Sequence, residues 1–290
     1  MPDIVIHAVA AAAYAGLAWH FWNTRWRAPQ AATAGGLRKW ERVAILAPLA
    51  LHGSVLYAGL FAAPELRFGF AQALSVMLWL AVLFYWVESL FYNLDGIQPP
   101  ALGLAALATP LPLLFPGHVS GAYAASLDFK LHLLLAMLAY SLFTIAILHA
   151  LLMALVERRL HRARSAHGTS AALGAQGAAM LSGPLGALPP LLTQERLLFR
   201  LIAAAFVLLT CTLATGFVFS ESLFGRPLRF DHKTLFGILS WATFALLLAG
   251  RHLYGWRGRT ALRWTLSGFV LLLLAYVGSR FVLEVVLGRV

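Results

Sequence analysis

Charged residues are scarce in this sequence, and cysteine is almost absent. Asp, Glu, Lys and Arg together make up 11% of the 290 residues, against roughly 25% in an ordinary soluble domain, while hydrophobic residues make up 61%. A water-soluble globular domain and a disordered chain are therefore both excluded. The single cysteine, Cys211, excludes a disulfide framework, a thiolate-based zinc or iron–sulfur site, and the paired cysteines that attach a haem covalently.

The motifs of several common enzyme classes are also missing. The sequence has no glycine-rich phosphate loop, no Ser-His-Asp order and no His-Glu-x-x-His motif, so we expect an accessory protein rather than an enzyme. The formal net charge of +11 would suggest a nucleic-acid partner for a soluble protein. Here the basic residues lie mainly in loops between apolar runs, which is a membrane-topology signal, so no nucleic-acid partner is expected.

Apolar runs long enough to cross a bilayer recur along the chain. A transmembrane helix needs about 20 such residues, and eight candidates are found: 3–24, 42–63, 69–92, 97–116, 129–157, 197–220, 232–250 and 261–288. The run at 97–116 is the weakest because Pro110 and Pro112 interrupt it, and we expect it to be short, kinked or partly re-entrant. The predicted fold is an all-α polytopic membrane bundle of eight transmembrane helices, forming one domain over residues 1–290.

Lys and Arg are unevenly distributed among the predicted loops. Fifteen lie on one side of the bundle and six on the other, with Arg280 inside the last span. Because cytoplasmic loops carry the excess of basic residues, both termini are expected on the periplasmic side of a bacterial inner (cytoplasmic) membrane. A glycine- and proline-rich stretch at 165–190 predicts a flexible cytoplasmic loop at about 158–195.

Three histidines in or beside the predicted spans are candidate ligands. His132 and His232 begin the fifth and seventh spans at the same outer depth, so they could supply both axial ligands of a haem iron from different helices. The alternative is that they hydrogen-bond lipid headgroups or neighbouring carbonyls. His52 lies near the midplane, where it needs a partner, and either ligand or proton-relay use or a helix-to-helix hydrogen bond would satisfy it.

Aromatic and cationic residues gather before the seventh span. Phe230 lies close to Arg229 and Lys233, and such a surface suits a flat macrocycle with two carboxylates, although an aromatic belt with snorkelling cations has the same composition. Arg280 lies within the last span, one turn before Glu284. It either pairs with Glu284 or reaches an anionic ligand.

Four segments resemble the cytochrome c assembly superfamily of membrane haem-handling proteins, of the CcsA, CcmC and CcmF type, and most closely its YpjD/HemX-like branch. They are Leu131 to Tyr140, Asp231-His232-Lys233 before Trp241, Gly255-Trp256-Arg257-Gly258-Arg259, and Tyr276-Val277-Gly278-Ser279-Arg280. Together they cover most of residues 128–284. The resemblance implies haem held near the outer face by two histidines that flank a tryptophan-rich outer segment, and a role in haem delivery to apocytochromes.

The sequence departs from this family pattern in two places. His132 falls where the first outer histidine is expected, but no histidine follows the last span. The stretch 216–231 carries phenylalanines in place of the tryptophans. We therefore hypothesise that His232 replaces the missing second ligand, because it matches His132 in depth.

The resulting expectation is a protein that binds haem b non-covalently and assists cytochrome c biogenesis or haem homeostasis, including haem transport. Its expected partners are haem, apocytochrome c or other biogenesis proteins, and the lipid bilayer. Two alternatives stay open. One is a non-haem membrane partner that regulates another protein through its basic cytoplasmic loops, and the other is a secondary transporter of a small solute, although paired broken helices are not evident.

Overall fold

The computed structural model describes residues 2–27, 37–62, 66–92, 94, 96–119, 124, 126–166, 191–224 and 231–288. Helix dominates this part of the chain. The elements are, in order, α1 (Pro2–Phe21), η1 (Trp22–Arg27), α2 (Lys39–Tyr57), η3 (Ala58–Ala62), β1 (Arg67–Phe68), α3 (Phe70–Glu88), α4 (Gln98–Ala108), α5 (Leu111–Leu114), β2 (His118–Val119), α6 (Leu127–Ala166), α8 (Leu191–Phe224), α9 (His232–Tyr254), α10 (Gly258–Leu273), η5 (Leu274–Gly278), α11 (Ser279–Phe281) and η6 (Val282–Val286).

Seven of the described helices are long and apolar enough to cross a membrane, and they coincide with seven of the eight predicted runs. They are Asp3–Arg27, Lys39–Leu60, Phe70–Glu88, Leu127–Arg158, Thr193–Phe219, His232–Tyr254 and Gly258–Val286. The chain is therefore a multi-pass helical membrane protein. Helices α6 and α8 also extend into the predicted cytoplasmic loop, since α6 ends at Ala166 and α8 begins at Leu191.

The predicted fourth span does not form one continuous helix. Helix α4 has 11 residues, so it rises about 16 Å, roughly half of a 30 Å hydrocarbon core. It ends because Pro110 has no backbone N–H to donate and its ring would clash with the preceding turn. The four-residue α5 follows. The predicted count of eight transmembrane helices is therefore not confirmed, and the described part of the chain holds seven.

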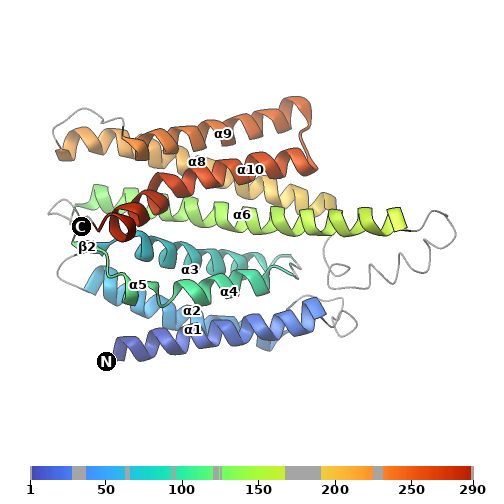
Figure 1. Cartoon of the computed structure of the whole chain (residues 1–290), viewed down its shortest axis with the longest axis horizontal. Helices are drawn as coiled ribbons and strands as arrows, with labels where there is room; N and C mark the ends of the chain where they lie inside the picture. The colour runs from blue at the N-terminus through green and yellow to red at the C-terminus, as the bar shows by residue number, and fades with distance from the viewer. Residues whose placement is uncertain are drawn as a thin grey trace.

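The segment after α3 nevertheless returns along the length of that helix. Strand β1, just before α3, pairs antiparallel with β2, just after α5, with Phe68 opposite His118. Figure 1 shows α4 and α5 beside α3, and shows both chain termini at the same end of the bundle. We call this end, which also holds the starts of α6 and α9, the termini end.

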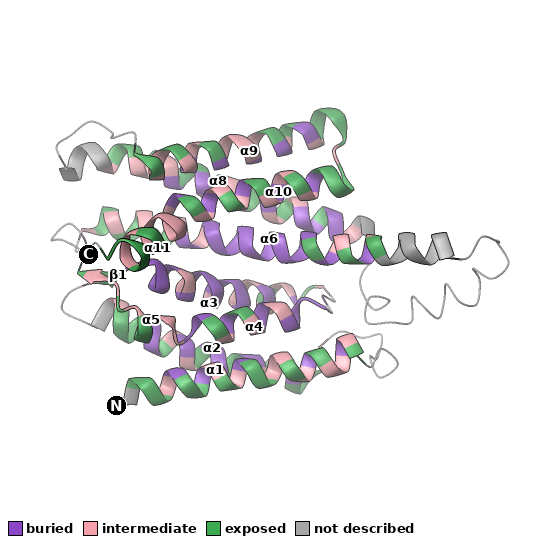
Figure 2. Cartoon of the chain, in the orientation of Figure 1, coloured by how far each residue is buried: buried purple, intermediate pink, exposed green. Residues whose placement is uncertain are grey.

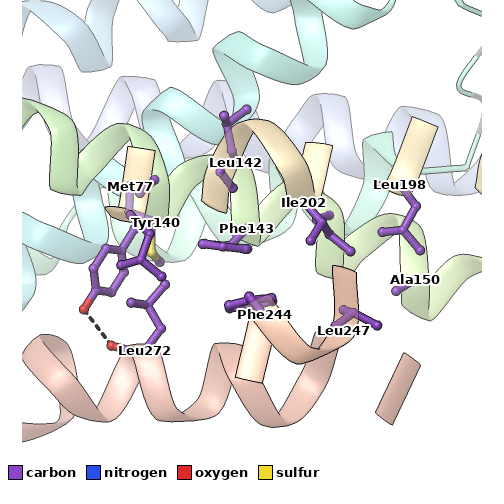
Figure 3. Packing of buried hydrophobic residues seen from close by; sticks show 14 of the residues in the cluster. Met77, Tyr140, Leu142, Phe143, Ala150, Leu198, Ile202, Phe244, Leu247 and Leu272 are labelled. Atoms are coloured by element: carbon purple, nitrogen blue, oxygen red, sulfur yellow. Dashed lines mark hydrogen bonds between the residues drawn. The ribbon is translucent and has the colours of Figure 1, made fainter. Parts of the chain in front are cut away.

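Two large apolar clusters, and a smaller one between β1, α3 and α6, hold the described part of the bundle together. One large cluster packs around α1 to α4, and the other joins α6 to α8, α9 and α10. Helices α3 and α6 pack against each other and form the buried centre of the molecule, while α1 and α9 lie at its outside (Figure 2). In the second cluster the rings of Phe143 and Phe244 stack with their centroids 3.9 Å apart, beside Ile202 and Leu247 (Figure 3). This stack is where α6 and α9 meet.

Gly268 on α10 gives Phe244 room to make that stack. A Cβ atom at this position would lie 2.9 Å from the Phe244 ring. We therefore expect Gly268→Ala to displace the ring and lower the free energy of unfolding by about 1–3 kcal/mol, measured by thermal denaturation in detergent micelles. Gly16→Ala on α1 is the matched control, because no atom lies within 4 Å of its added Cβ. It should be neutral or stabilise by up to about 1 kcal/mol; equal losses in both variants would contradict the packing argument.

Candidate functional site

His132, in the second turn of α6, is held in one tautomer by α8. Its Nδ1 lies 3.0 Å from Thr215 Oγ1. The Thr215 hydroxyl donates to the backbone carbonyls of Cys211 and Thr212, at 2.9 and 3.0 Å, so its oxygen must accept from His132. The proton therefore resides on Nδ1, and Nε2 keeps its lone pair. The backbone of Thr212 is a further hydrogen-bond partner of the ring. No side-chain hydrogen bond to Nε2 is found among the described residues, and a metal-binding imidazole requires this nitrogen to keep its lone pair.

A glycine lets α8 approach this imidazole closely. A Cβ atom at position 216 would lie 3.3 Å from His132 Cε1, which is tighter than an ordinary contact. Sequence reasoning found His132 but missed both Thr215 and Gly216. The available signal was a Thr-Gly pair in an apolar run, which is typical of close helix packing in any membrane protein.

His132 and His232 lie at similar depth in the structure. His132 precedes Phe143 on α6 by eleven residues, and His232 precedes Phe244 on α9 by twelve. These separations correspond to rises of about 17 and 18 Å along the two helices, measured from the stack of Phe143 on Phe244. Eleven residues return a helix to within about 20° of the same direction, so His132 points roughly as Phe143 does, and its contacts there are with Thr215 and Gly216 of α8. Twelve residues turn His232 by about 120° from Phe244, and its side chain is exposed.

The first turn of α9 is capped by an ionised carboxylate. Asp231 Oδ1 accepts from the backbone N–H of Thr234 at 3.0 Å and from its hydroxyl at 3.1 Å. Burial raises the pKa of the Asp231 carboxyl, but these hydrogen bonds and the charge of Lys233 outweigh it and hold the pKa below its ordinary value. The cap fixes where α9 starts, and hence where His232 and Lys233 lie.

Arg280 lies at the same end without a carboxylate partner in the described part of the chain. Its guanidinium carbon lies 5.9 Å from the Tyr276 ring centroid, and its buried Nε has no hydrogen-bond acceptor within the part of the chain that the structure describes. Glu284, which the sequence suggested as a partner, instead pairs with His118, with His118 Nε2 3.3 Å from Glu284 Oε1. The charge of Lys233 is repelled by Arg280 and attracted by Asp231. A bound anion would offset the repulsion between the two cations.

The backbone that leads to Arg280 is irregular, and a side chain of α6 hydrogen-bonds to it. The last membrane helix changes from α10 to the π-helical η5 before Arg280. Such π-helical segments interrupt the regular hydrogen-bond pattern of an α-helix and are frequent at functional sites. Here the Tyr140 hydroxyl on α6 donates to the Leu272 carbonyl at 2.6 Å (Figure 3). Tyr140 therefore couples the helix of His132 to the segment that leads to Arg280.

His52 lies apart from this end and is fully buried between helices. Its Nε2 lies 2.8 Å from Ser75 Oγ on α3, and its Nδ1 lies 3.3 Å from Thr109 Oγ1 after α4. The ring of Tyr14 on α1 packs edge-on against it, with centroids 5.8 Å apart. Both ring nitrogens are thus occupied by side chains of other segments. This geometry favours helix-to-helix hydrogen bonding, and the prediction that His52 contributes to cofactor binding remains untested.

Two other predicted site residues, Arg229 and Phe230, lie outside the described residues. Their contact with a cofactor therefore stays a prediction from the sequence. No hydrogen bond or ring contact is found between His132 and His232 in the described structure, and joint coordination of one iron by the two histidines likewise stays a prediction. The structure does give the hydrogen bond of His132 to Thr215 and the electrostatic repulsion between Lys233 and Arg280.

Comparison with known proteins decides the family. The sequence matches the cytochrome C assembly protein family over residues 41–287, which includes every described site residue above. The chain belongs to this family. It is 31% identical over 181 residues to inner membrane protein YpjD of Escherichia coli K12, an alignment that covers 62% of this chain and 60% of YpjD. The recognition made from residues 128–284 is thereby confirmed.

Other relatives extend the same picture. The chain is 33% identical over 192 residues to an uncharacterized 28.8 kDa protein of Azospirillum brasilense, covering 66% of this chain and 65% of that protein. It is 34% identical over 87 residues to the cytochrome c biogenesis protein CcsA of Prochlorococcus marinus MIT 9515, covering 30% and 28% of the two chains. The matches thus span less than two thirds of each of these relatives. No solved structure matches the chain.

Proposed function

We propose that this cytochrome c assembly family member is an inner-membrane haem-handling protein that binds haem b non-covalently at the termini end. It would act as an accessory protein in cytochrome c biogenesis or haem homeostasis, with haem and apocytochrome c or other biogenesis proteins as partners. The name of the Escherichia coli relative supports the inner membrane. The name of the Prochlorococcus relative supports cytochrome c biogenesis. The charge asymmetry of the loops supports periplasmic termini.

The observation that carries this proposal is the fixed tautomer of His132. An imidazole whose Nδ1–H is held by Thr215, and whose Nε2 has no side-chain hydrogen bond in the described structure, is prepared to bind an iron. His232, at matching depth on α9, is the proposed second ligand. When bound, the haem would supply any redox chemistry, while the protein binds, orients and shields it.

The cations at the termini end fit the two carboxylates of a haem. Arg280 has a buried Nε with no acceptor among the described residues, and the charge of Lys233 repels it. Propionate carboxylates would satisfy both groups through charge-assisted hydrogen bonds. Arg229 is proposed to join them, and Phe230 to pack on the macrocycle, from their places in the sequence.

The proposal is tested by purifying the full chain from haem-sufficient cells and measuring its optical spectrum and haem content per chain. We expect haem b near one per chain. Arg280→Gln should weaken binding of added haemin about tenfold or more, because one charge-assisted bond is lost, but should leave the binding of haemin dimethyl ester unchanged. Lys39→Gln, exposed at the opposite end, is the control. A chain that binds no haem even when haemin is added would refute the proposal.

A further inference from the structure

A second polar feature lies at the termini end, in the half of the bundle that His132 does not touch. It is a cavity of about 280 Å³ between α1, the end of α2, β1 and the turn around α5. Its volume is below the roughly 300–1,000 Å³ of common small-molecule sites, so it suits a headgroup better than a macrocycle. Its walls are mainly apolar, and its polar lining includes Asp3, His7 and Arg67.

The two charged side chains of this cavity have no ion-pair partner in the described structure. Asp3 and Arg67 both line it, yet they do not pair with each other. A pocket that presents a carboxylate and a guanidinium, neither of which has an ion-pair partner among the described residues, is complementary to a ligand that carries one positive and one negative group. A purely anionic or purely cationic ligand would leave one of the two charges unpaired.

His7 adds an acceptor beside the carboxylate. It is buried, and its Nδ1 lies 2.7 Å from the Thr109 carbonyl oxygen, which can only accept, so the proton resides on Nδ1. The lone pair of Nε2 is left for the cavity. Asp3 and His7 are one helical turn apart on α1 and therefore share a face. Together they offer acceptors to an ammonium group that still carries hydrogens.

The surroundings of the cavity indicate a lipid rather than a solute. It lies at the ends of two membrane helices, where the headgroups of the bilayer meet the protein. Exposed apolar side chains flank its lining residues on both sides, with Ile4 58% exposed beside Asp3 and Leu114 67% exposed beside Leu113. An acyl chain can follow such a surface while its headgroup enters the cavity.

We propose that this cavity binds the headgroup of a phospholipid that carries a primary ammonium beside its phosphate, with the ammonium at Asp3 and His7 and the phosphate at Arg67. This inference is independent of haem binding, because none of these residues belongs to the site around His132. Phosphatidylethanolamine has the required chemistry. Phosphatidylglycerol lacks the ammonium, and phosphatidylcholine has an ammonium without hydrogens to donate.

The test is native mass spectrometry of the full chain, delipidated and re-supplied with each of these three lipids in equal amounts. We expect phosphatidylethanolamine to be retained about tenfold more than either of the others. Asp3→Asn should abolish the preference over phosphatidylglycerol, and Arg67→Gln should lower retention of phosphatidylethanolamine about tenfold. Both side chains are exposed, so these variants should fold. Lys39→Gln is the control and should retain the lipid as the wild type does.

Competition with free phosphoethanolamine distinguishes a lipid ligand from a soluble zwitterionic ligand. We expect it to compete only weakly, because it has no acyl chain to lie along the apolar flanks. Competition at the same concentration as the lipid would show that the cavity takes a soluble zwitterion and would overturn the lipid assignment. Equal retention of the three lipids, or unchanged retention in Asp3→Asn and Arg67→Gln, would overturn the site itself.

Discussion

Replacing His132 with alanine is expected to lower the haem retained by the purified protein at least tenfold. The variant removes the imidazole on α6 whose Nδ1–H donates to Thr215 on α8, which orients Nε2. The measurement is haem per chain, with the optical spectrum of the same sample. His252→Ala is the matched control, since His252 is exposed at the far end of α9 from His232.

Variants of Thr215, the hydrogen-bond partner of His132 on α8, distinguish a ligand role of His132 from a packing role. Thr215→Val keeps the volume but cannot accept the Nδ1–H, so it should weaken haem binding about tenfold, as is common when the partner of a ligating imidazole is lost. Thr215→Ser should restore haem binding.

His232→Ala should leave some haem bound but shift its spectrum from low-spin toward high-spin, because one of the two proposed iron ligands would be lost. An unchanged low-spin spectrum in both His132→Ala and His232→Ala would remove the proposed coordination.

Replacing Glu41 with alanine is expected to lower the free energy of unfolding by about 3–5 kcal/mol. Glu41 and Arg25 are each 1% exposed, with Arg25 Nη2 2.9 Å from Glu41 Oε2. His20 Nε2 lies 3.0 Å from the other carboxylate oxygen, and the Arg38 backbone N–H donates to the same carboxylate. Removing the carboxylate takes away the group that Arg25, His20 and the Arg38 N–H all contact, and losing one partner is the costly way to break a buried pair.

Thermal denaturation in detergent micelles measures this effect. Two further variants test whether the loss of stability comes from burial of the pair. Glu157→Ala removes a pair with Arg259 that is longer, at 3.7 Å, and more exposed, so it should cost at most about 1 kcal/mol. The double variant Arg25→Met with Glu41→Leu removes both charges together and should recover most of the loss. Equal losses in Glu41→Ala and Glu157→Ala would contradict the argument from burial.

The sequence predicted the helices well because a bilayer imposes a local rule. Each span must satisfy its own backbone hydrogen bonds and present about 20 apolar residues, and both requirements are properties of a single run. The run expected at 69–92 became α3 at 70–88, and the run expected at 232–250 became α9 at 232–254. The exception follows from the same rule, since the prolines at 110 and 112 cannot continue the helix that ends at Ala108.

The candidate site was predictable only in part, because side-chain partners come from distant positions. The depth of His132 and His232 follows from counting residues, and the recognition of the family from residues 128–284 is confirmed. Nothing in the sequence pairs His132 with Thr215, which lies 83 residues away. Sequence spacing also suggested that Arg280 meets Glu284 one turn later, whereas Glu284 turns to His118.

By itself, the sequence determined that this protein is a multi-pass helical membrane protein of the cytochrome c assembly family, since hydropathy and short motifs are local properties. Only the tertiary structure decided which nitrogen of His132 faces Thr215 and that Arg280 has no carboxylate partner among the described residues. It also decided that His52 bonds to Ser75 and Thr109 between helices. The physical reason is that a proton position or an unpaired charge depends on the group opposite, and packing rather than chain order brings that group there.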